Sequence, residues 1–255
     1  MDEPTGTIVV VPCFDEQERL DVDAFLAFAE DHPDIRFLLV DDGSGDDTLS
    51  VLQSLASRRP DAFSVLPLSP NQGKAEAVRR GILLALDRSP ARVGFWDADL
   101  ATPLQAVPEF VSVLERRPEA ELVLGSRVRL LGRTIERHQG RHYFGRVAAT
   151  VVSNLLGLPV YDTQCGAKLF RATPRLRQLF TEPFVTRWAF DVEILARWLI
   201  AADELERRGA SGRIVEIPVA EWHDVGGSKL GPLDFIRAPG ELARIWRAYG
   251  RELRR

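Results

Sequence analysis

The sequence predicts a single α/β domain in which helices flank a mostly parallel sheet. Short apolar segments alternate with longer segments whose apolar residues recur at helical spacing, and short connections join them. The apolar segments lack the polar alternation of a half-exposed strand, so helices should cover both faces of the sheet. Acidic and polar residues follow several of these segments directly, which is where the loops of an open α/β sheet bind ligands.

The first two strands and their helices are the clearest elements. Thr7 to Val11 is a β-branched run that predicts a buried strand, and Pro12 should stop it because proline cannot donate to the ladder. Leu20 to Glu30 follows with apolar residues at helical spacing. Ile35 to Val40 predicts the second strand, and the acidic, glycine-containing loop after it leads into a helix that runs to about Arg58.

Three more strands complete the first half of the chain. The run from Phe63 to Leu66 predicts the third strand, and a helix through Leu86 follows it. Arg92 to Trp96 predicts the fourth strand. The segment from Pro103 to Arg116 then predicts a helix, because proline is favoured in the first turn. Glu121 to Leu124 predicts the fifth strand.

The second half of the chain is less regular. Its expected elements are a helix from about 143 to 156, a loop entering a strand at 162–170, an amphipathic helix at 190–207, a strand at 213–219 and a glycine-rich loop at 222–230. No repeat or low-complexity linker interrupts the chain. Residues 1–231 are therefore expected to form one domain and residues 232–255 a basic amphipathic helix.

Composition narrows the class of protein. The chain has 45% hydrophobic and 27% charged residues, and its net charge of −4 provides no basic field for nucleic acid. Two cysteines are too few for a disulfide scaffold or a cysteine-rich zinc site, which favours a reducing, cytoplasmic setting. No signal peptide precedes the first strand, and the longest nearly apolar run, Val147 to Val160, is too short to cross a bilayer. No membrane span is therefore expected.

Two carboxylates one residue apart, Asp97 and Asp99, follow the fourth strand. An unpaired charge is costly inside a buried strand, so the pair should lie at the strand's carboxyl end, beside the ligand crevice. Carboxylate oxygens suit Mg²⁺ or Mn²⁺, which can bridge protein carboxylates to substrate phosphates. The pair therefore predicts a metal site, and a solvated turn before the next helix is the alternative.

The loops after the first four strands should meet at one rim. These loops carry, in order, Glu16, Asp41 with Asp42, Lys74, and Asp97 with Asp99. A divalent cation would let this acidic rim hold phosphates, Asp42 could accept hydrogen bonds from a ribose or a base, and Lys74 at a helix start could meet an anion. A plain turn with a helix cap is the alternative for the loop at Asp42. The chain has neither a P-loop nor a Gly-x-Gly-x-x-Gly motif.

A basic segment, Arg127 to Arg146, follows the fifth strand beside this rim and contains six arginines together with His138 and His142. Guanidinium groups bind phosphates through two oxygens at once, so the segment predicts a site for a second anion. A solvated basic face is the alternative. Asp191, near the start of the helix at 190–207, is either a helix N-cap or a carboxylate that faces the reacting sugar as a base or an orienting group.

Together these motifs resemble those of the inverting family 2 glycosyltransferases of the GT-A fold, and among them the dolichyl-phosphate β-glucosyltransferase type. The resemblance runs in consistent order from about residue 7 to 231. The strings that carry it are Val-Pro-Cys-Phe-Asp-Glu at 11–16, Asp-Asp-Gly-Ser at 41–44, Asn-Gln-Gly-Lys at 71–74, Asp-Ala-Asp-Leu-Ala-Thr-Pro at 97–103, Gly-Ser-Arg at 125–127, Asp-Thr-Gln-Cys-Gly at 162–166, Arg-Trp-Ala-Phe-Asp-Val-Glu at 187–193 and Gly-Ser-Lys-Leu at 227–230.

The resemblance implies a GT-A, Rossmann-like fold and a role for each of these residues. The donor nucleotide would be held by Pro12, Glu16, Asp42, Lys74 and Asp97. The Mg²⁺ or Mn²⁺ on its diphosphate would be held by Asp99 together with Asp97. The acceptor phosphate would be held by Arg127, Arg137, Arg141 and Lys229. Asp191 and Arg127 would act in catalysis.

The resemblance also implies a reaction. Mannosyl-transferring relatives carry a glutamine two residues after the second aspartate, whereas this chain has Ala101, as the glucosyl-type enzymes do, which favours UDP-glucose over GDP-mannose. An acceptor phosphate is already anionic at neutral pH, so positioning and charge stabilisation would supply catalysis without a strong base. The expected activity is metal-dependent transfer of glucose to a polyprenyl or dolichyl phosphate, with inversion to a β-linked product, on the cytoplasmic face of a membrane.

Other interpretations stay open. The glucosyl-type relatives have an N-terminal membrane anchor that this sequence does not show, which motivates a soluble small-molecule or protein acceptor with Asp191 as general base. A nucleotidyltransferase is disfavoured because the loop at 12–16 lacks glycine-rich, basic character. A non-catalytic nucleotide-binding protein would tolerate Asp99→Asn. In the C-terminal helix, the apolar spacing of Leu242, Ile245 and Tyr249 among arginines fits either a membrane interface or packing on the domain or a partner.

Overall fold

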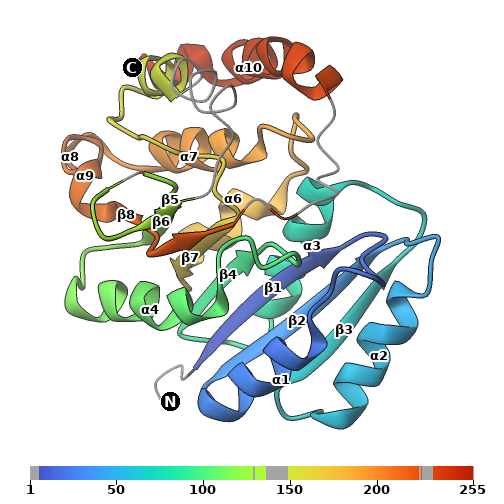
Figure 1. Cartoon of the computed structure of the whole chain (residues 1–255). Coiled ribbons are helices and arrows are strands. Elements are labelled where there is room, and N and C mark those ends of the chain that lie inside the picture. Colours follow the sequence, from blue (N-terminus) through green and yellow to red (C-terminus); the bar gives the residue numbers. More distant parts are fainter. Residues whose placement is uncertain (1–5, 129, 136–148, 224, 226–231, 255) are drawn as a thin grey trace.

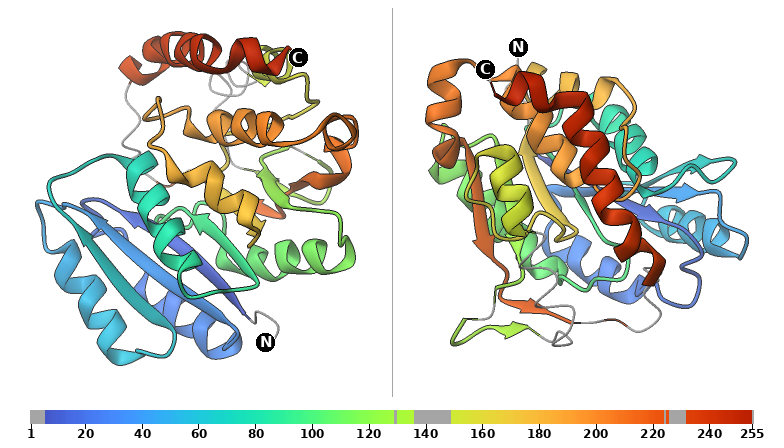
Figure 2. Two further views of the ribbon diagram at one scale, coloured as in Figure 1. Left: turned by 180° about the vertical axis from the view of Figure 1, so that it is seen from behind. Right: turned by 90° about the horizontal axis from the view of Figure 1, so that it is seen from above.

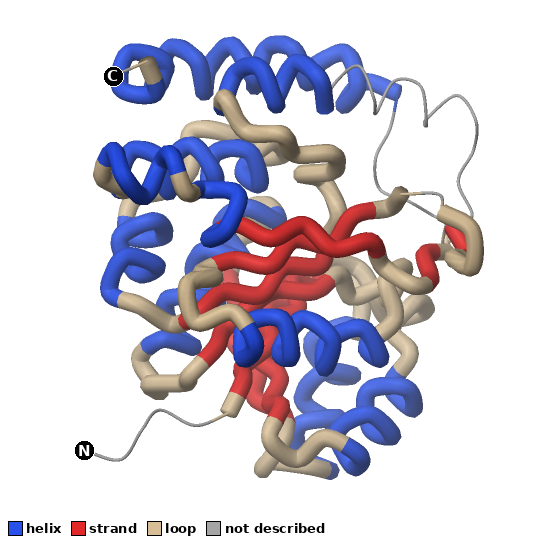
Figure 3. Tube along the Cα trace, turned by 90° about the vertical axis from the view of Figure 1, so that its left-hand side faces the viewer, coloured by secondary structure: helices blue, strands red, loops and turns tan. Residues whose placement is uncertain are grey.

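The computed structural model describes residues 6–128, 130–135, 149–223, 225 and 232–254, with the backbone alone for 232–238. A seven-stranded sheet crosses the middle of the molecule and helices lie on both of its faces (Figures 1 and 3). The strand order is β3-β2-β1-β4-β7-β5-β8, and a separate two-stranded ribbon pairs β6 with β9. Neighbouring strands of the large sheet are parallel except around β7, which runs antiparallel to both β4 and β5. The predicted mostly parallel α/β sheet is confirmed.

The first half of the chain forms the elements that its apolar pattern predicts. They are β1 (Thr7–Cys13), α1 (Val22–Asp31), β2 (Ile35–Asp42), α2 (Thr48–Arg58), β3 (Phe63–Leu68), α3 (Lys74–Leu86), β4 (Arg92–Trp96), the 3-10 helix η1 (Leu104–Ala106), α4 (Val107–Arg116) and β5 (Leu122–Ser126). Pro12 does not stop β1 as expected. Pairing with β4 ends at Val10, so the missing N–H of Pro12 falls where only β2 is paired.

The second half contains shorter elements. They are β6 (Thr134–Ile135), β7 (Ala167–Arg171), α6 (Pro174–Thr181), α7 (Phe190–Ala201), α8 (Glu204–Arg208), α9 (Ala210–Arg213), β8 (Ile214–Pro218), β9 (Glu221–Trp222) and α10 (Pro232–Leu253). Residues 149–156 are also helical. The expected single helix over 190–207 is wrong, because Asp203 and Glu206 form a capping box that starts α8 separately.

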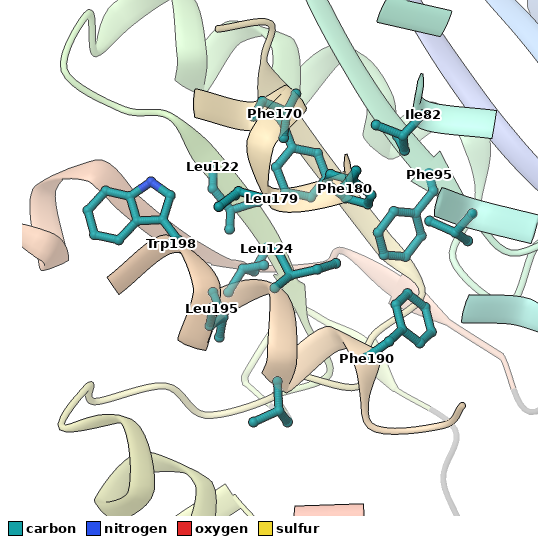
Figure 4. Close-up of a cluster of buried hydrophobic side chains, with 14 of the residues drawn as sticks. Ile82, Phe95, Leu122, Leu124, Phe170, Leu179, Phe180, Phe190, Leu195 and Trp198 are labelled. Carbon is teal, nitrogen blue, oxygen red and sulfur yellow. The ribbon is translucent and has the colours of Figure 1, made fainter. Parts of the chain in front are cut away.

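Two apolar layers hold the helices against the sheet. Helices α3, α6 and α7 cover one face, and α1, α2 and α4 cover the other (Figure 2). On the first face the rings of Phe95, Phe170, Phe180 and Phe190 gather around the ends of the central strands (Figure 4). Phe95 and Phe190 lie 5.8 Å apart between ring centroids, so burial fixes the end of β4 against the start of α7.

The C-terminal helix α10 packs on the domain. Ile245 is fully buried, and Leu242, Tyr249 and Leu253 pack against the same apolar layer as α7. Trp246 stays 38% exposed, at the outer side of the helix. The apolar face of α10 is therefore used within the protein. Among the helices that the structure describes, none combines the length and the apolar character needed to cross a bilayer.

A buried carboxylate connects α7 with α10. Glu193 is fully buried and accepts hydrogen bonds from the Val185 N–H at 3.0 Å, the Thr186 hydroxyl at 3.1 Å, Arg197 Nη2 at 2.8 Å and the Tyr249 hydroxyl at 2.7 Å. Removing one partner of such a network leaves the others buried without a bond. Glu193 therefore stabilises the segment from 185 to the start of α7.

Glu193→Gln is expected to lower the free energy of unfolding by about 2 kcal/mol, because Arg197 loses its charged partner and an NH₂ group replaces an acceptor. For a chain of this size that corresponds to a fall in Tm of about 4–8 °C. Thermal denaturation followed by circular dichroism measures it. Glu252→Gln, at an exposed position of α10, is the matched control. An unchanged Tm in Glu193→Gln would show that the network does not stabilise the fold.

Candidate active site

The loops after β1 and β2 are tied to each other at the carboxyl edge of the sheet. Asp15 accepts a hydrogen bond from the Gly45 N–H at 2.7 Å and donates its own N–H to Ser44 Oγ at 3.0 Å. The Glu16 N–H donates to Thr48 Oγ1 at 2.7 Å. Asp15 has a φ of 47°, a left-handed conformation that costs roughly 1–3 kcal/mol and is often found at functional sites. These contacts hold the buried Glu16 at the rim.

Asp42, at the end of β2, shapes the loop before α3. Its carboxylate accepts hydrogen bonds from Asn71 Nδ2 at 2.9 Å, the Gln72 N–H at 2.9 Å and the Gly73 N–H at 2.7 Å. Burial raises the pKa of Asp42, although these donors and the charge of Arg187 oppose the rise. The carboxylate predicted to meet the donor's ribose or base is thus engaged in holding this loop, and its contact with a donor stays a prediction.

Asp41 is a second carboxylate at the same strand end. It is 3% exposed, and its Oδ1 has no hydrogen-bond partner among the residues that the structure describes. A buried acceptor without a donor costs free energy that a ligand N–H or O–H could recover. Asp41 is therefore a candidate ligand contact that the sequence analysis placed on the rim without giving it a role.

Asp97 is held from two sides at the end of β4. Lys74 Nζ, at the start of α3, lies 2.5 Å from Asp97 Oδ1, and the Asp97 N–H donates to the Gly166 carbonyl at 3.1 Å. The carboxylate lies directly over Gly166, where an added Cβ would overlap its atoms. The residue just before β7 must therefore be glycine for Asp97 to keep this position.

Asp99 lies two residues farther on, in a tight turn. Its Oδ1 accepts a hydrogen bond from the Ala101 N–H at 3.1 Å, and its Oδ2 lies 3.2 Å from Arg19 Nη2. Leu100, between these residues, has a φ of 51°. Burial raises the pKa of Asp99, and the nearby charge of Asp97 raises it further. Two carboxylates that repel each other in this way favour a cation beside them.

A buried ion pair lies next to this pair of carboxylates. Lys168, in β7, is 1% exposed; its Nζ lies 2.5 Å from Asp191 Oδ1 and donates to the Cys165 carbonyl at 2.7 Å. Asp191 is the second residue of α7 and does not cap it, so the N-cap interpretation is wrong. Burial raises the pKa of Asp191, while the charges of Lys168 and Lys74 lower it.

Lys74 connects the two groups of acids. Burial alone would lower the pKa of its ammonium, but the charges of Asp97, Asp191 and Asp99 outweigh burial and raise it. Lys74 is thus charged, and it lies where α3 begins, so the N-terminal end of that helix adds to the positive potential. This arrangement suits the diphosphate of a nucleotide sugar.

Arg127, after β5, is held by Asp162. Its Nε and Nη2 donate to the two carboxylate oxygens at 2.6 Å and 2.7 Å, and its guanidinium lies 5.4 Å from the ring centroid of Trp222. Burial would lower the pKa of Arg127, but Asp162 keeps it above its usual value. Asp162 therefore fixes the orientation of Arg127 and offsets its charge, and the predicted contact with an acceptor phosphate would use the remaining nitrogen, Nη1.

The structure brings most of the predicted residues to one rim. Arg19 connects Glu16 at 3.5 Å with Asp99 at 3.2 Å, although sequence reasoning gave Arg19 no role. Pro12 lies one residue before the end of β1. Arg137, Arg141 and Lys229 lie outside the described residues. Lys168 was also missed; a lysine inside an apolar strand signals a buried charge with a partner.

The loop before α7 is held by the C-terminal helix. Glu241, which is 9% exposed, accepts hydrogen bonds from the N–H groups of Arg187, Trp188 and Ala189 at 3.3, 2.9 and 2.7 Å. The side chain of Arg187 in turn lies against Gly73, at the loop that Asp42 shapes. Glu241 thus fixes the segment from which Arg187 and Asp191 reach the site.

Glu241→Ala is expected to lower kcat about tenfold, because the three N–H groups lose their acceptor and the loop shifts. Glu241→Gln keeps an acceptor oxygen and should recover most of the rate. Initial rates are measured at a temperature where circular dichroism shows each variant folded, with Glu252→Ala as the control on the same helix. Equal rates for Glu241→Ala and the native chain would contradict a positioning role.

The donor atoms at the rim fit a divalent cation whose remaining ligands are phosphates. Among the described residues no three His, Cys, Asp or Glu side chains group closely enough to hold a cation alone. Asp97 and Asp99 supply two carboxylates, and Mg²⁺ is commonly bound through one or two carboxylates together with substrate phosphates and water. His223 lies beside this turn, because its N–H donates to the Ala101 carbonyl at 2.9 Å.

Comparison with known proteins gives consistent matches. The family model described as Glycosyl transferase family 2 matches residues 8–176. The dolichyl-phosphate beta-glucosyltransferase of Drosophila melanogaster is 33% identical, over 94% of this chain and 74% of its own length. The human enzyme of the same name is 32% identical, over 91% of this chain and 72% of its own length.

Solved structures match the fold. Glucosyl-3-phosphoglycerate synthase from Mycobacterium tuberculosis, in complex with phosphoglyceric acid, has a TM-score of 0.66 at 20% identity, over 96% of this chain and 80% of its own. The same enzyme in complex with Mn²⁺ and UDP-glucose has a TM-score of 0.65 at 20% identity, over 96% of this chain and 79% of its own. At this identity the likeness establishes a shared fold.

Proposed function

The chain belongs to glycosyl transferase family 2, and on that basis we propose that it transfers glucose from UDP-glucose to a polyprenyl phosphate. It is a glycosyltransferase. The proposed acceptor rests on sequence identity of about 30% to dolichyl-phosphate beta-glucosyltransferases, along more than nine tenths of the chain. The chain covers more than 70% of each of these relatives.

The donor would lie along the rim from β2 to β4. Asp41, whose Oδ1 has no partner among the described residues, would offer an acceptor to the nucleoside, and Lys74 would face the diphosphate. Asp99, with Asp97, would hold a Mg²⁺ or Mn²⁺, and the bound cation would offset the charge that develops on the departing diphosphate. The complex of a structural neighbour with Mn²⁺ and UDP-glucose supports this choice of donor and cation.

The acceptor would approach from the side of Arg127. Its phosphate oxygen attacks the anomeric carbon opposite the diphosphate, the bond from that carbon to the diphosphate oxygen breaks, and UDP leaves with the electron pair. The product is a β-linked sugar phosphate. An ionised phosphate has no proton to lose, so the chain's residues need only position it and stabilise charge. We place this reaction on the cytoplasmic face of a membrane.

A soluble acceptor hydroxyl would need a base, and Asp191 is the candidate. Its carboxylate is buried, and Lys168 holds it in an ion pair. A carboxylate fixed in this way is suited to orienting Lys168 and the nearby Lys74 more than to removing a proton. The site therefore favours an acceptor that is already anionic.

Product formation from UDP-glucose and a short polyprenyl phosphate, with Mn²⁺ or Mg²⁺ and an EDTA control, tests the proposal. We expect a glucosylated lipid phosphate whose formation stops when EDTA is added. UDP-glucose turnover with phosphate-free polyprenols or soluble sugars, and none with the lipid phosphate, would contradict the proposed acceptor. Turnover with GDP-mannose in place of UDP-glucose would contradict the proposed donor.

A further inference from the structure

Two consecutive leucines, one half exposed and one fully exposed, lie a few residues after Arg127 of the candidate site. Leu130 is 49% exposed and Leu131 is 105% exposed, which makes Leu131 the most exposed large apolar side chain among the described residues. They lie in a turn closed by the Arg133 N–H, which donates to the Leu130 carbonyl at 3.1 Å. Gly132 supplies the φ of 82° that this turn needs at its third position. A formed turn thus holds the leucines outward.

The turn leads directly into the β6–β9 ribbon. Thr134 in β6 donates its N–H to the Ala220 carbonyl at 3.0 Å, and Ile135 is buried. The β6–β9 ribbon continues the parallel pairing of β5 with β8, from the carboxyl edge where the site lies. In Figure 3 this ribbon stands out from the body of the molecule at the right-hand edge. The leucines are therefore carried on a projection from the active-site rim.

Positive charge accompanies the leucines. Arg133 follows them, after Gly132, in the described structure, and the sequence from 127 to 146 holds six arginines against one glutamate. The whole chain, by contrast, has a net charge of −4. An exposed apolar turn within an arginine-rich stretch of sequence, on an otherwise acidic protein, matches a surface that combines anionic headgroups with a hydrocarbon interior.

We propose that the Leu130–Leu131 turn docks the protein on an anionic lipid bilayer and thereby presents the rim to the lipid-linked acceptor; this inference rests on the proposed function. Leu131 is four positions after Arg127 in the sequence, a reach of at most about 14 Å. The headgroup layer of one leaflet is roughly 5–8 Å thick. Leucines at the boundary of the acyl chains thus leave Arg127 at or just above the level of the lipid phosphates, where an acceptor phosphate lies.

The test uses the purified chain and vesicles without donor or acceptor. Co-sedimentation is compared between phosphatidylcholine vesicles and phosphatidylcholine mixed with phosphatidylglycerol. The variants are Leu131→Ser and Leu130→Ser/Leu131→Ser. The matched control is Leu205→Ser, an 80% exposed leucine on α8, which lies away from the ribbon. All these positions are exposed, so the fold should tolerate each change.

We expect the native chain and Leu205→Ser to bind the anionic vesicles, with binding that weakens as salt rises. Leu131→Ser should bind roughly tenfold more weakly, and the double variant more weakly still. Equal binding of all variants, or no binding by the native chain, would overturn the proposal. So would an oligomer that Leu131→Ser dissociates, because the turn would then contact a second copy.

Activity measurements separate this inference from the proposed function. With acceptor embedded in anionic vesicles, Leu131→Ser should raise the apparent KM for the acceptor and leave kcat unchanged. With a short, water-soluble prenyl phosphate, native and variant rates should be equal. Vesicle binding without sugar transfer would contradict the proposed function and leave the docking inference standing. Sugar transfer in detergent without vesicle binding would contradict the docking inference and leave the proposed function standing.

Discussion

Asp99→Asn is expected to lower the rate of sugar transfer about 10³-fold, or ~4 kcal/mol in the barrier, while the protein stays folded. Asparagine keeps the oxygen that accepts from the Ala101 N–H, so the turn should hold its shape. What is lost is the negative charge that would hold a cation at the rim, together with the ion pair to Arg19. Burial and the charge of Asp97 raise the pKa of this carboxyl, and the charges of Lys74 and Arg19 oppose the rise.

Rates with Mn²⁺ and Mg²⁺, beside circular dichroism spectra, measure this effect. Asp61→Asn is the control, since that carboxylate is 65% exposed and pairs with Arg59 away from the rim. A variant that keeps more than about a tenth of the native rate at saturating metal would show that Asp99 does not hold the cation. If the native chain and Asp99→Asn both bind nucleotide and neither turns over, the result would favour the non-catalytic interpretation.

Gly166→Ala is expected to reduce transfer at least about 10²-fold. The added Cβ would overlap the carboxylate of Asp97, and the Asp97 N–H is bonded to the Gly166 carbonyl, so the side chain must turn away. Its ion pair with Lys74 would break with it. The added methyl group would thus misorient the Asp97 carboxylate while every charged residue of the site is kept.

Gly212→Ala is the matched control for this change, because an added Cβ there meets no atom within 4 Å. Initial rates and the Tm of both variants separate the local effect from unfolding. Gly166→Ala should lose activity with a Tm close to that of Gly212→Ala. Full activity in Gly166→Ala would mean that the position of Asp97 over this glycine does not matter for transfer.

The sequence predicted the half of the sheet that local patterns determine. Strands β1, β2 and β4 are mostly apolar and buried, and polar rim residues lie at or just after the end of each. The sequence therefore predicted the strand ends and the site residues together. Lys74 and Asp97 were placed on the same edge, and the structure brings them to 2.5 Å.

The features that depend on distant pairing could not be read in this way. Nothing local in Ala167–Arg171 shows that β7 lies antiparallel between β4 and β5. The contact of Glu241 with the loop before α7 joins positions more than 50 residues apart. The break before α8, by contrast, had a visible signal, since Asp203 and Glu206 have the spacing of a capping box.

The central place of β7 also has a consequence for the order in which the protein assembles. Strand β4 pairs with β1 on one side, but its other edge is filled by β7, roughly 70 residues later. At 5–20 residues per second, a ribosome needs about 4–15 s to add them, and during that time the edge is exposed. Strand β5 is made before β7 and has no other route to the sheet, since β7 alone connects it with β4. The nascent chain therefore joins its two halves in a late, long-range step, and a ribosome stalled before residue 171 would hold a half-sheet prone to aggregation.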